Sequence, residues 1–312
     1  MPRRSTTEQP MSETVTISVS GALCWNSLPN FLGQLEPLRA DPPKEVRLDL
    51  SAMTYCWPVG VAALAASVFW LRQLGVPRIQ ALPPREADTE RYLTRIDFYR
   101  VLNAPERMKF NRFDSSGRFV EVTQLTRVED CNEVVAKVEA VFEQKMQLTK
   151  ETKNALDFVV AELLENIFHH AESPVGGFLC CQAYPYSLEL AIVDLGRGIE
   201  RALADNPAAS AVVREKGPLT AALEPRVTGR PQFNTGFGLF WTSQLIKANC
   251  GELGIQSHGH RLLQHGNMPV ETADGFWPGT AIHLSFKRNK TMDIVQIFKR
   301  LAPPEKGFEF IG

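Results

Sequence analysis

A short segment near the middle of the chain carries an unusual number of polar groups for a helix. Residues 161–174, AELLENIFHHAESP, place Glu162, Asn166 and His169 among leucines. At 100° per residue, these three side chains fall within about 60° of one another, opposite an apolar flank. The amide oxygen suits Mg²⁺, the carboxylate could polarise a water molecule, and the imidazole could reach a phosphate. Taken alone, this spacing is better explained by an ordinary solvated helix face.

The motifs that follow the helix change this interpretation. VDLGRGI ends an apolar strand at Asp194, and Gly196 and Gly198 then allow the backbone to turn tightly around a flat ligand. The Asp194 carboxylate can accept a hydrogen bond from an exocyclic amine such as that of adenine. A single motif of this kind is usually only a turn. Its position after the polar helix makes a functional interpretation more convincing than the motif alone would.

Two further motifs contain glycine. NTGFGLF, at 234–240, leads through Gly236 and Gly238 into a helix N-terminus, where backbone N–H groups and the helix dipole can bind phosphate. WPGTAIHLSF places Gly279 and Thr280 at the head of a last strand. The order of these motifs predicts a nucleotide site.

In this order the motifs resemble the ATP-binding domain shared by histidine kinases, anti-sigma-factor serine kinases, type II topoisomerases, heat-shock chaperones and MutL-type repair proteins. ELLEN corresponds to the N-box of that GHKL family, DLGRG and TGFGL to its two glycine boxes, and the GT pair to its closing motif. The resemblance covers roughly residues 106–287. It implies a Bergerat-type α/β sandwich with a mixed sheet, with ATP held between the helices and a flexible lid.

The resemblance also implies a role for each matching position. Asn166 would bind Mg²⁺, Glu162 would activate the attacking group, and Asp194 would bind the adenine amine with water-mediated support from Thr280. His169 lies where many relatives have a basic residue that faces the phosphates, so it departs from the pattern. Close backbone contacts to the nucleotide would come from the two glycine boxes: Gly196, Gly198, Thr235, Gly236 and Gly238. The lid would span the irregular residues 199–233, with these cations as candidates to neutralise the triphosphate: Arg201, Arg214, Lys216, Arg226 and Arg230.

The first hundred residues resemble a second family. DLSAMTYCWPVGVAALA, at 49–65, is similar to the STAS domain of anti-sigma-factor antagonists, which carry a phosphorylatable serine at a helix start. Here Trp57, Pro58 and Val59 occupy the Asp-Ser-Ser positions, with Gly60 retained. Proline has no hydroxyl to phosphorylate but suits the first turn of a helix. We therefore expect a STAS-like docking or regulatory module.

Strand and helix patterns alternate along the chain and predict an α/β fold class in two domains. Strands are expected at 14–21, 45–53, 76–83 and 119–126, and helices at 27–38, 59–74, 86–102, 129–146, 150–171 and 238–251. The segment 258–265, HGHRLLQH, reads as a hairpin tip rather than a metal site. The domain boundaries follow from these patterns: a disordered leader at 1–12, a STAS-like domain at 13–103, a linker at 104–118, the ATP-binding domain at 119–290 and a tail at 291–312.

Composition limits the partners. The formal net charge of -1 gives no long-range attraction to nucleic acid or to an anionic membrane. The longest apolar run, residues 59–71, is too short to span a bilayer and predicts a buried helix. Cys180 and Cys181 are neighbours in a strand and should point to opposite faces as free thiols, as in a reducing cytoplasm.

Three functions remain open at this stage. The chain could be a serine protein kinase acting on a separate STAS-like partner, an ATPase that switches a partner or homodimer interface, or a nucleotide sensor without turnover. A histidine kinase is disfavoured, because no histidine precedes His169 to act as phosphoacceptor. We expect a cytoplasmic regulator that uses ATP and Mg²⁺ and binds a protein partner.

Overall fold

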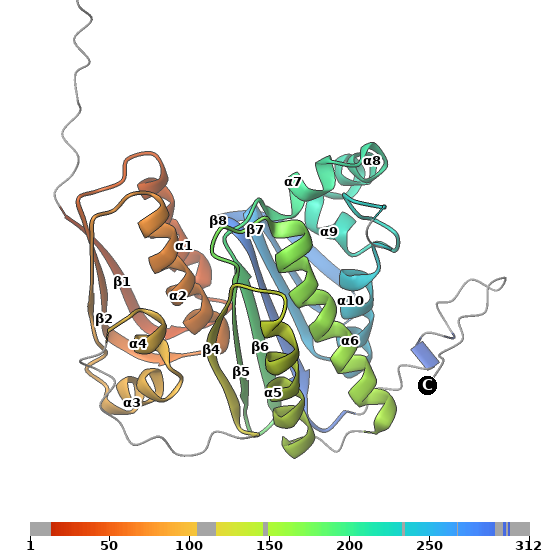
Figure 1. Cartoon of the computed structure of the whole chain (residues 1–312), viewed down its shortest axis with the longest axis horizontal. Helices are drawn as coiled ribbons and strands as arrows, with labels where there is room; N and C mark the ends of the chain where they lie inside the picture. Colours follow the sequence, from red (N-terminus) through yellow and green to blue (C-terminus); the bar gives the residue numbers. More distant parts are fainter. Residues whose placement is uncertain are drawn as a thin grey trace, which may run out of the picture.

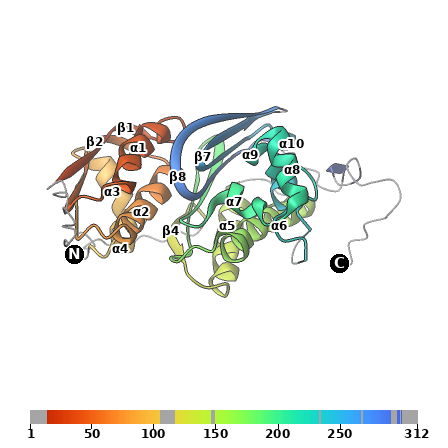
Figure 2. The ribbon, with the colours of Figure 1, turned by 90° about the horizontal axis from the view of Figure 1, so that it is seen from above.

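The computed structural model describes residues 14–104, 117–145, 149–232, 235–266 and 268–290, with Gln296, Ile297 and Lys299. The leader predicted at 1–12, most of the linker at 104–118 and most of the tail at 291–312 lie outside the described residues. Two sheets and the helices between and beside them form four successive layers (Figures 1 and 2). The α/β class predicted from the sequence is confirmed.

The N-terminal region, residues 14–104, contains a parallel three-stranded sheet in the order β1-β2-β3. Its strands are β1 (Val15–Leu23), β2 (Glu45–Cys56) and β3 (Arg78–Leu82). Its helices are α1 (Leu28–Leu35), the 3₁₀ turn η1 (Glu36–Arg39), α2 (Pro58–Gln73), α3 (Ala87–Arg95) and α4 (Phe98–Val101). The single helix predicted at 86–102 is divided in two, because Asp97 adopts a left-handed conformation with φ of 61°.

The C-terminal region, residues 117–290, contains a five-stranded sheet in the order β4-β5-β6-β8-β7. Its strands are β4 (Phe119–Leu125), β5 (Gly177–Ala183), β6 (Ser187–Asp194), β7 (Glu252–His265) and β8 (Met268–Lys287). All four pairings are antiparallel, so the mixed sheet implied by the resemblance is wrong. The segment 258–265 is a continuation of β7 paired with β8, rather than a hairpin tip, because its side chains alternate in the long antiparallel ladder.

Helices of the C-terminal region cover one face of this sheet and one of its ends (Figure 1). The face is covered by α5 (Asp130–Lys145), α6 (Lys150–Asn166) and α10 (Gly238–Asn249). A π-helical turn, Ile167–Ala171, extends α6. The segment predicted as an irregular lid instead contains three short helices: α7 (Gly198–Ala204), α8 (Pro207–Lys216) and α9 (Pro218–Ala222). Prolines at the first turns of α8 and α9 favour these helix starts.

Helix α2 fills the space between the two sheets. Of its 16 residues, 13 are buried, which explains why it is apolar on all sides instead of amphipathic. Pro58 occupies the first turn, as expected from the sequence. Gly60 permits close approach to the end of β1, because a Cβ there would lie 2.6 Å from the Leu23 carbonyl oxygen. The prediction of a buried helix at 59–71 is confirmed, and no described helix is long and apolar enough to cross a membrane.

Both faces of the five-stranded sheet are buried. In β5, Phe178 and Cys180 join the core between the two sheets, while Leu179 and Cys181 join the core under α5, α6 and α10. We call these the inter-sheet core and the helix-side core. This alternation explains the continuous apolar run of β5, because every second side chain enters a different core. Cys180 and Cys181 are free thiols on opposite faces, as predicted.

A tryptophan from the N-terminal region packs against the five-stranded sheet. Trp25 stacks on His283 with ring centroids 5.7 Å apart, and the Arg261 guanidinium lies 4.0 Å from the Trp25 ring centroid. Arg261 also donates to the Trp25 carbonyl oxygen at 2.7 Å. The ring lies against Gly254 of β7, where a Cβ would come within 2.5 Å of it. A glycine in this strand therefore provides the notch into which Trp25 packs.

We expect Gly254→Ala to lower the free energy of unfolding by about 1–3 kcal/mol, because overpacking displaces the Trp25 ring. Urea denaturation monitored by tryptophan fluorescence measures the change. Gly259→Ala on the same strand is the matched control, since a Cβ there meets nothing within 4 Å. Equal losses of stability in the two variants would contradict the claim that Trp25 packs closely against Gly254.

Candidate functional site

A cavity of about 110 Å³ lies where α6, the end of β6, the middle of β8 and the lid helices meet. Most of its wall is apolar, including Ile167, Ile192 and Leu239. The polar side chains that line it are few: Glu162, Asn166, His170, Asp194, Thr228 and Thr280. An apolar cavity with a small convergent set of polar groups is typical of a small-molecule site.

Helix α6 is fixed by its apolar flank. Thr149 caps its N-terminus, accepting from the backbone N–H of Thr152 at 3.2 Å. The predicted core-facing residues are all buried: Leu156, Val160, Leu163, Leu164 and Ile167. Glu162 and Asn166 consequently face the cavity, as predicted, and the side chain of neither forms a hydrogen bond with a described residue.

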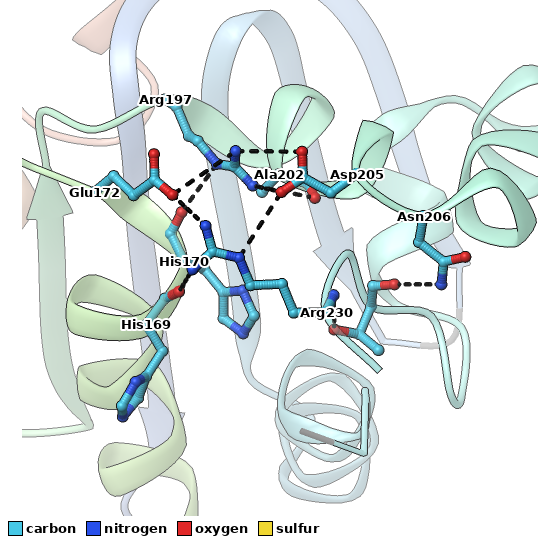
Figure 3. Close-up of polar contacts among 9 residues, drawn as sticks. His169, His170, Glu172, Arg197, Ala202, Asp205, Asn206 and Arg230 are labelled. Carbon is cyan, nitrogen blue, oxygen red and sulfur yellow. Dashed lines mark hydrogen bonds and ion pairs between the residues drawn. The ribbon is translucent and has the colours of Figure 1, made fainter. Parts of the chain in front are cut away.

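The structure places His170, rather than His169, on the cavity wall. His169 is exposed, and in Figure 3 the two imidazole rings point in different directions. The cause is the π-helical turn after Asn166, which contains more residues per turn than an α-helix. The 100° spacing used for the prediction therefore fails beyond Asn166. The fourth residue after Asn166 returns to the cavity.

Asp194 ends β6 at the base of the cavity with only 6% of its surface exposed. Its Oδ1 accepts from the backbone N–H groups of Gly196 at 2.8 Å and Thr280 at 3.1 Å. Its Oδ2 has no hydrogen-bond partner among the described residues. Trp277, in the inter-sheet core, donates from Nε1 to the Asp194 carbonyl oxygen at 2.9 Å. Side chain and backbone of Asp194 are thus held in place while one carboxylate oxygen stays available.

Two glycines allow this arrangement. A Cβ at Gly279 would lie 2.4 Å from both the carbonyl oxygen and Oδ1 of Asp194. A Cβ at Gly196 would lie 2.0 Å from the Ala171 carbonyl oxygen, which accepts from the backbone N–H of Arg197 at 2.8 Å. Gly196 therefore serves the contact between this turn and the end of α6, and it does not line the cavity.

The second glycine box meets the same cavity. Gly236 and Gly238 line it, as does Gly198 of the first glycine box, whereas Thr235 is exposed and does not line it. A Cβ at Gly238 would lie 2.5 Å from Glu162 Oε2, so this carboxylate lies against the first turn of α10. The fold thus brings Glu162 next to the N-terminus of α10.

Burial sets the charge of the site. Desolvation raises the pKa of Asp194 to about 6, although its two backbone hydrogen bonds act in the opposite direction. Desolvation, and secondarily the Glu165 charge, raises the pKa of Glu162. Desolvation, followed by the positive charge of Arg230, lowers the pKa of His170. The site is therefore anionic near neutral pH, and no Lys or Arg belongs to the lining residues.

Two arginines lie beside the cavity and bind protein groups (Figure 3). Arg230 donates to the His169 carbonyl oxygen at 2.8 Å and pairs with Glu172. Arg197 donates to the His170 carbonyl oxygen at 3.3 Å and pairs with Asp205. These contacts connect the end of α6, the first glycine box and both ends of the lid.

None of the five predicted lid cations lines the cavity. Lys216 pairs with Glu224 at 2.6 Å, and Arg230 belongs to the cluster just described. The lid contacts the cavity through the backbone segment Val227–Gly229 and through α7 and α9. In the described structure, therefore, the lid supplies mainly apolar cover and one hydroxyl, Thr228.

Two hydroxyl residues were missed by the sequence reasoning. Thr228 lines the cavity, and its carbonyl oxygen accepts from Asn206 Nδ2 at 2.8 Å. Ser257 on β7 donates to the Gly279 carbonyl oxygen at 2.9 Å and accepts from the Ile199 backbone N–H at 3.0 Å. Neither belongs to a glycine motif, so no local sequence signal marked them. Only the pairing of β7 with β8 brings Ser257 to this turn.

The polar groups fit a metal ion only in part. Within the described residues, no group of three or more His, Cys, Asp or Glu side chains is placed to hold a metal. Asn166 alone would supply a protein oxygen, so Mg²⁺ would need phosphate oxygens and water for its remaining ligands. That is how Mg²⁺ usually binds with nucleotides.

We expect Asp194→Asn to raise the free energy of unfolding at pH 7.5 by about 1–3 kcal/mol. The folded-state pKa of about 6 exceeds the ordinary value of 3.8 for an aspartate side chain, so ionisation destabilises the fold as pH rises through this window. The gain should shrink below pH 6 and disappear near pH 3, where Asp194 is protonated in both the folded and the unfolded state. Urea denaturation across this range measures it, with exposed Asp41→Asn as the control. A pH-independent difference would contradict the assignment.

A scan against the models of known protein families finds no match to this chain. A search of curated proteins likewise finds no matching sequence. The functional assignment therefore depends on the residues around the cavity.

Proposed function

We propose that this chain is a cytoplasmic ATP-binding regulatory protein that uses Mg-ATP to phosphorylate or switch a protein partner. The observation that carries the proposal is Asp194. A buried carboxylate with one oxygen held by two backbone N–H groups and the other unpartnered is suited to an adenine amine. The apolar walls beside it suit the faces of a purine ring.

The opposite part of the cavity supports the phosphate end of the proposal. Asn166 has a free amide, and α10 begins at Gly238 next to Glu162. A helix N-terminus attracts anions, and an amide oxygen can bind Mg²⁺. Mg²⁺ would neutralise charge on the phosphates, which matters because the cavity lining holds no cationic side chain from Lys or Arg.

Glu162 would orient a serine hydroxyl or a water molecule and accept its proton. Its pKa is raised by burial, which makes the carboxylate a stronger base than an exposed glutamate. This role serves both a serine kinase and an ATPase, so the same residue underlies both reactions.

The lid favours a conformational switch as the accompanying event. The cavity of about 110 Å³ is smaller than the roughly 300–1,000 Å³ of most small-molecule sites. Lid helix α9 is held by Glu271, which accepts from the backbone N–H of Thr220 at 2.7 Å. A whole nucleotide would require the lid to shift, and this shift could alter a partner or homodimer surface.

The N-terminal region would act as a docking module and not as the phosphoacceptor. Pro58 and Val59, at the positions of the STAS phosphorylation site, are buried. Trp57 packs on Tyr184 with ring centroids 4.5 Å apart, at the end of the sheet remote from Asp194. A phosphorylated serine would therefore belong to a separate protein, such as a STAS-like partner.

The proposal is tested by incubating the full chain with γ-labelled Mg-ATP, with and without cell lysate, while following free phosphate and labelled protein. Acid-stable label on a lysate protein indicates a serine kinase. Free phosphate alone indicates an ATPase switch. ATP binding without either product indicates a nucleotide sensor, and the absence of ATP binding would overturn the proposal.

We expect Glu162→Gln to retain ATP binding and lose turnover about 10²- to 10⁴-fold, the usual contribution of a general base. Glu165→Gln is the matched control, because Glu165 lies on the same helix but is exposed. Calorimetric ATP affinity and phosphate release are measured on both variants. Unchanged turnover in Glu162→Gln would remove its proposed role.

We expect Asp194→Asn to weaken ATP binding about tenfold to hundredfold and to reduce the preference for ATP over GTP, since one buried base-directed hydrogen bond is lost. Wild-type affinity should also fall as pH is lowered through about 6, because protonation occupies the acceptor oxygen. Titrations with both nucleotides across pH measure this. Identical pH profiles of wild type and variant would refute the contact.

A further inference from the structure

A second cleft, of about 360 Å³, lies at the other end of the five-stranded sheet. It is formed by the turn between β5 and β6, the end of α5, the start of β4, the end of α3 and the residue after β8. Because a strand rises about 3.3 Å per residue, the two ends of the eight-residue β6 are about 23 Å apart. The cleft is therefore separate from the Asp194 cavity, whose lining includes residues of the lid helices α7 and α9. Figure 1 shows these helices at the opposite end of the sheet from the turn between β5 and β6.

The lining of this cleft is basic without compensating acid. Four of its nine lining residues are cationic and none carries a carboxylate: Arg95, Arg118, Lys145 and Arg288. The whole chain is nearly balanced, with 34 Lys and Arg against 35 Asp and Glu, so this segregation is local. A cleft lined by one sign of charge concentrates counter-ions of the other sign.

The cations differ in how firmly they are held. Arg288 donates from Nε to the Lys145 carbonyl oxygen at 2.7 Å and from Nη1 to the Tyr184 carbonyl oxygen at 2.8 Å. These bonds fix its guanidinium, and no described carboxylate pairs with its charge. Arg95 lies over the Phe119 ring, 5.2 Å from its centroid.

The remaining two cations have no polar partner within the part of the chain that the structure describes. The side chains of Arg118 and Lys145 make no hydrogen bond or ion pair with any described residue. The cleft thus combines one anchored guanidinium, one stacked guanidinium and two adjustable cations around an aromatic wall.

We propose that this cleft binds a small molecule of the phosphate class that carries two or more negative charges. Arginine forks match phosphate oxygens, and four cations require more than one negative charge for neutralisation. The volume lies within the range of small-molecule sites. The proposal does not depend on the function of the Asp194 cavity.

The test is calorimetric titration of the full chain with inorganic pyrophosphate at low ionic strength. EDTA is included so that binding through Mg²⁺ at the other cavity does not contribute. Wild-type protein should bind pyrophosphate at one site per chain, and binding should weaken as salt is added. Arg118→Gln/Lys145→Gln should weaken it about tenfold or more, because hydrogen bonds to charged groups are lost.

The matched control is Lys44→Gln/Arg85→Gln, which makes the same charge change on exposed residues outside the cleft. Circular dichroism checks that each variant is folded, and Arg95→Gln provides a second test if the double variant is not. Absence of binding to wild type would overturn the proposal. So would equal weakening by the control, or unchanged binding by both cleft variants.

Discussion

The burial of both faces of the five-stranded sheet is the constraint on which the rest of the structure depends. One face packs on α5, α6 and α10, and the other on α1 and α2 of the N-terminal region. Helix α2 is apolar on all sides because it lies between two sheets, and it has no solvent-facing flank to keep polar. The two regions therefore share one core, and each stabilises the other. The Trp25 contact with Gly254 and His283 adds shape specificity to this shared apolar surface.

Packing between the two sheets also affects the candidate nucleotide site. Trp277 belongs to the inter-sheet core, yet its indole N–H holds the carbonyl oxygen of Asp194. The Thr280 backbone, three residues further along β8, holds the Asp194 side chain. Packing of the N-terminal region against the back of β8 thus supports the wall on which a purine would lie.

Much of the candidate site was predictable because its determinants are local. The apolar spacing of residues 150–167 fixes which flank of α6 is buried, and Glu162 and Asn166 then face the cavity. The strand before Asp194 and the glycines after it define a turn that needs no distant information. His169 was misplaced because a π-helical turn changes the rotation per residue, and nothing in IFHHA signals that turn. Thr235 and Gly196 follow the motif but do not line the cavity.

The sequence by itself determined the order of the strands and of the long helices, the burial of α2, and most of the polar residues that line the cavity, since periodicity and glycine placement act over a few residues. Only the tertiary structure decided the antiparallel pairing of the second sheet, the helical form of the lid and the position of Ser257. It also brought cations into one cleft, because Arg95, Arg118 and Arg288 come from separate parts of the sequence. Long-range pairing selects among several arrangements that local patterns allow equally, and packing of the whole chain makes that selection.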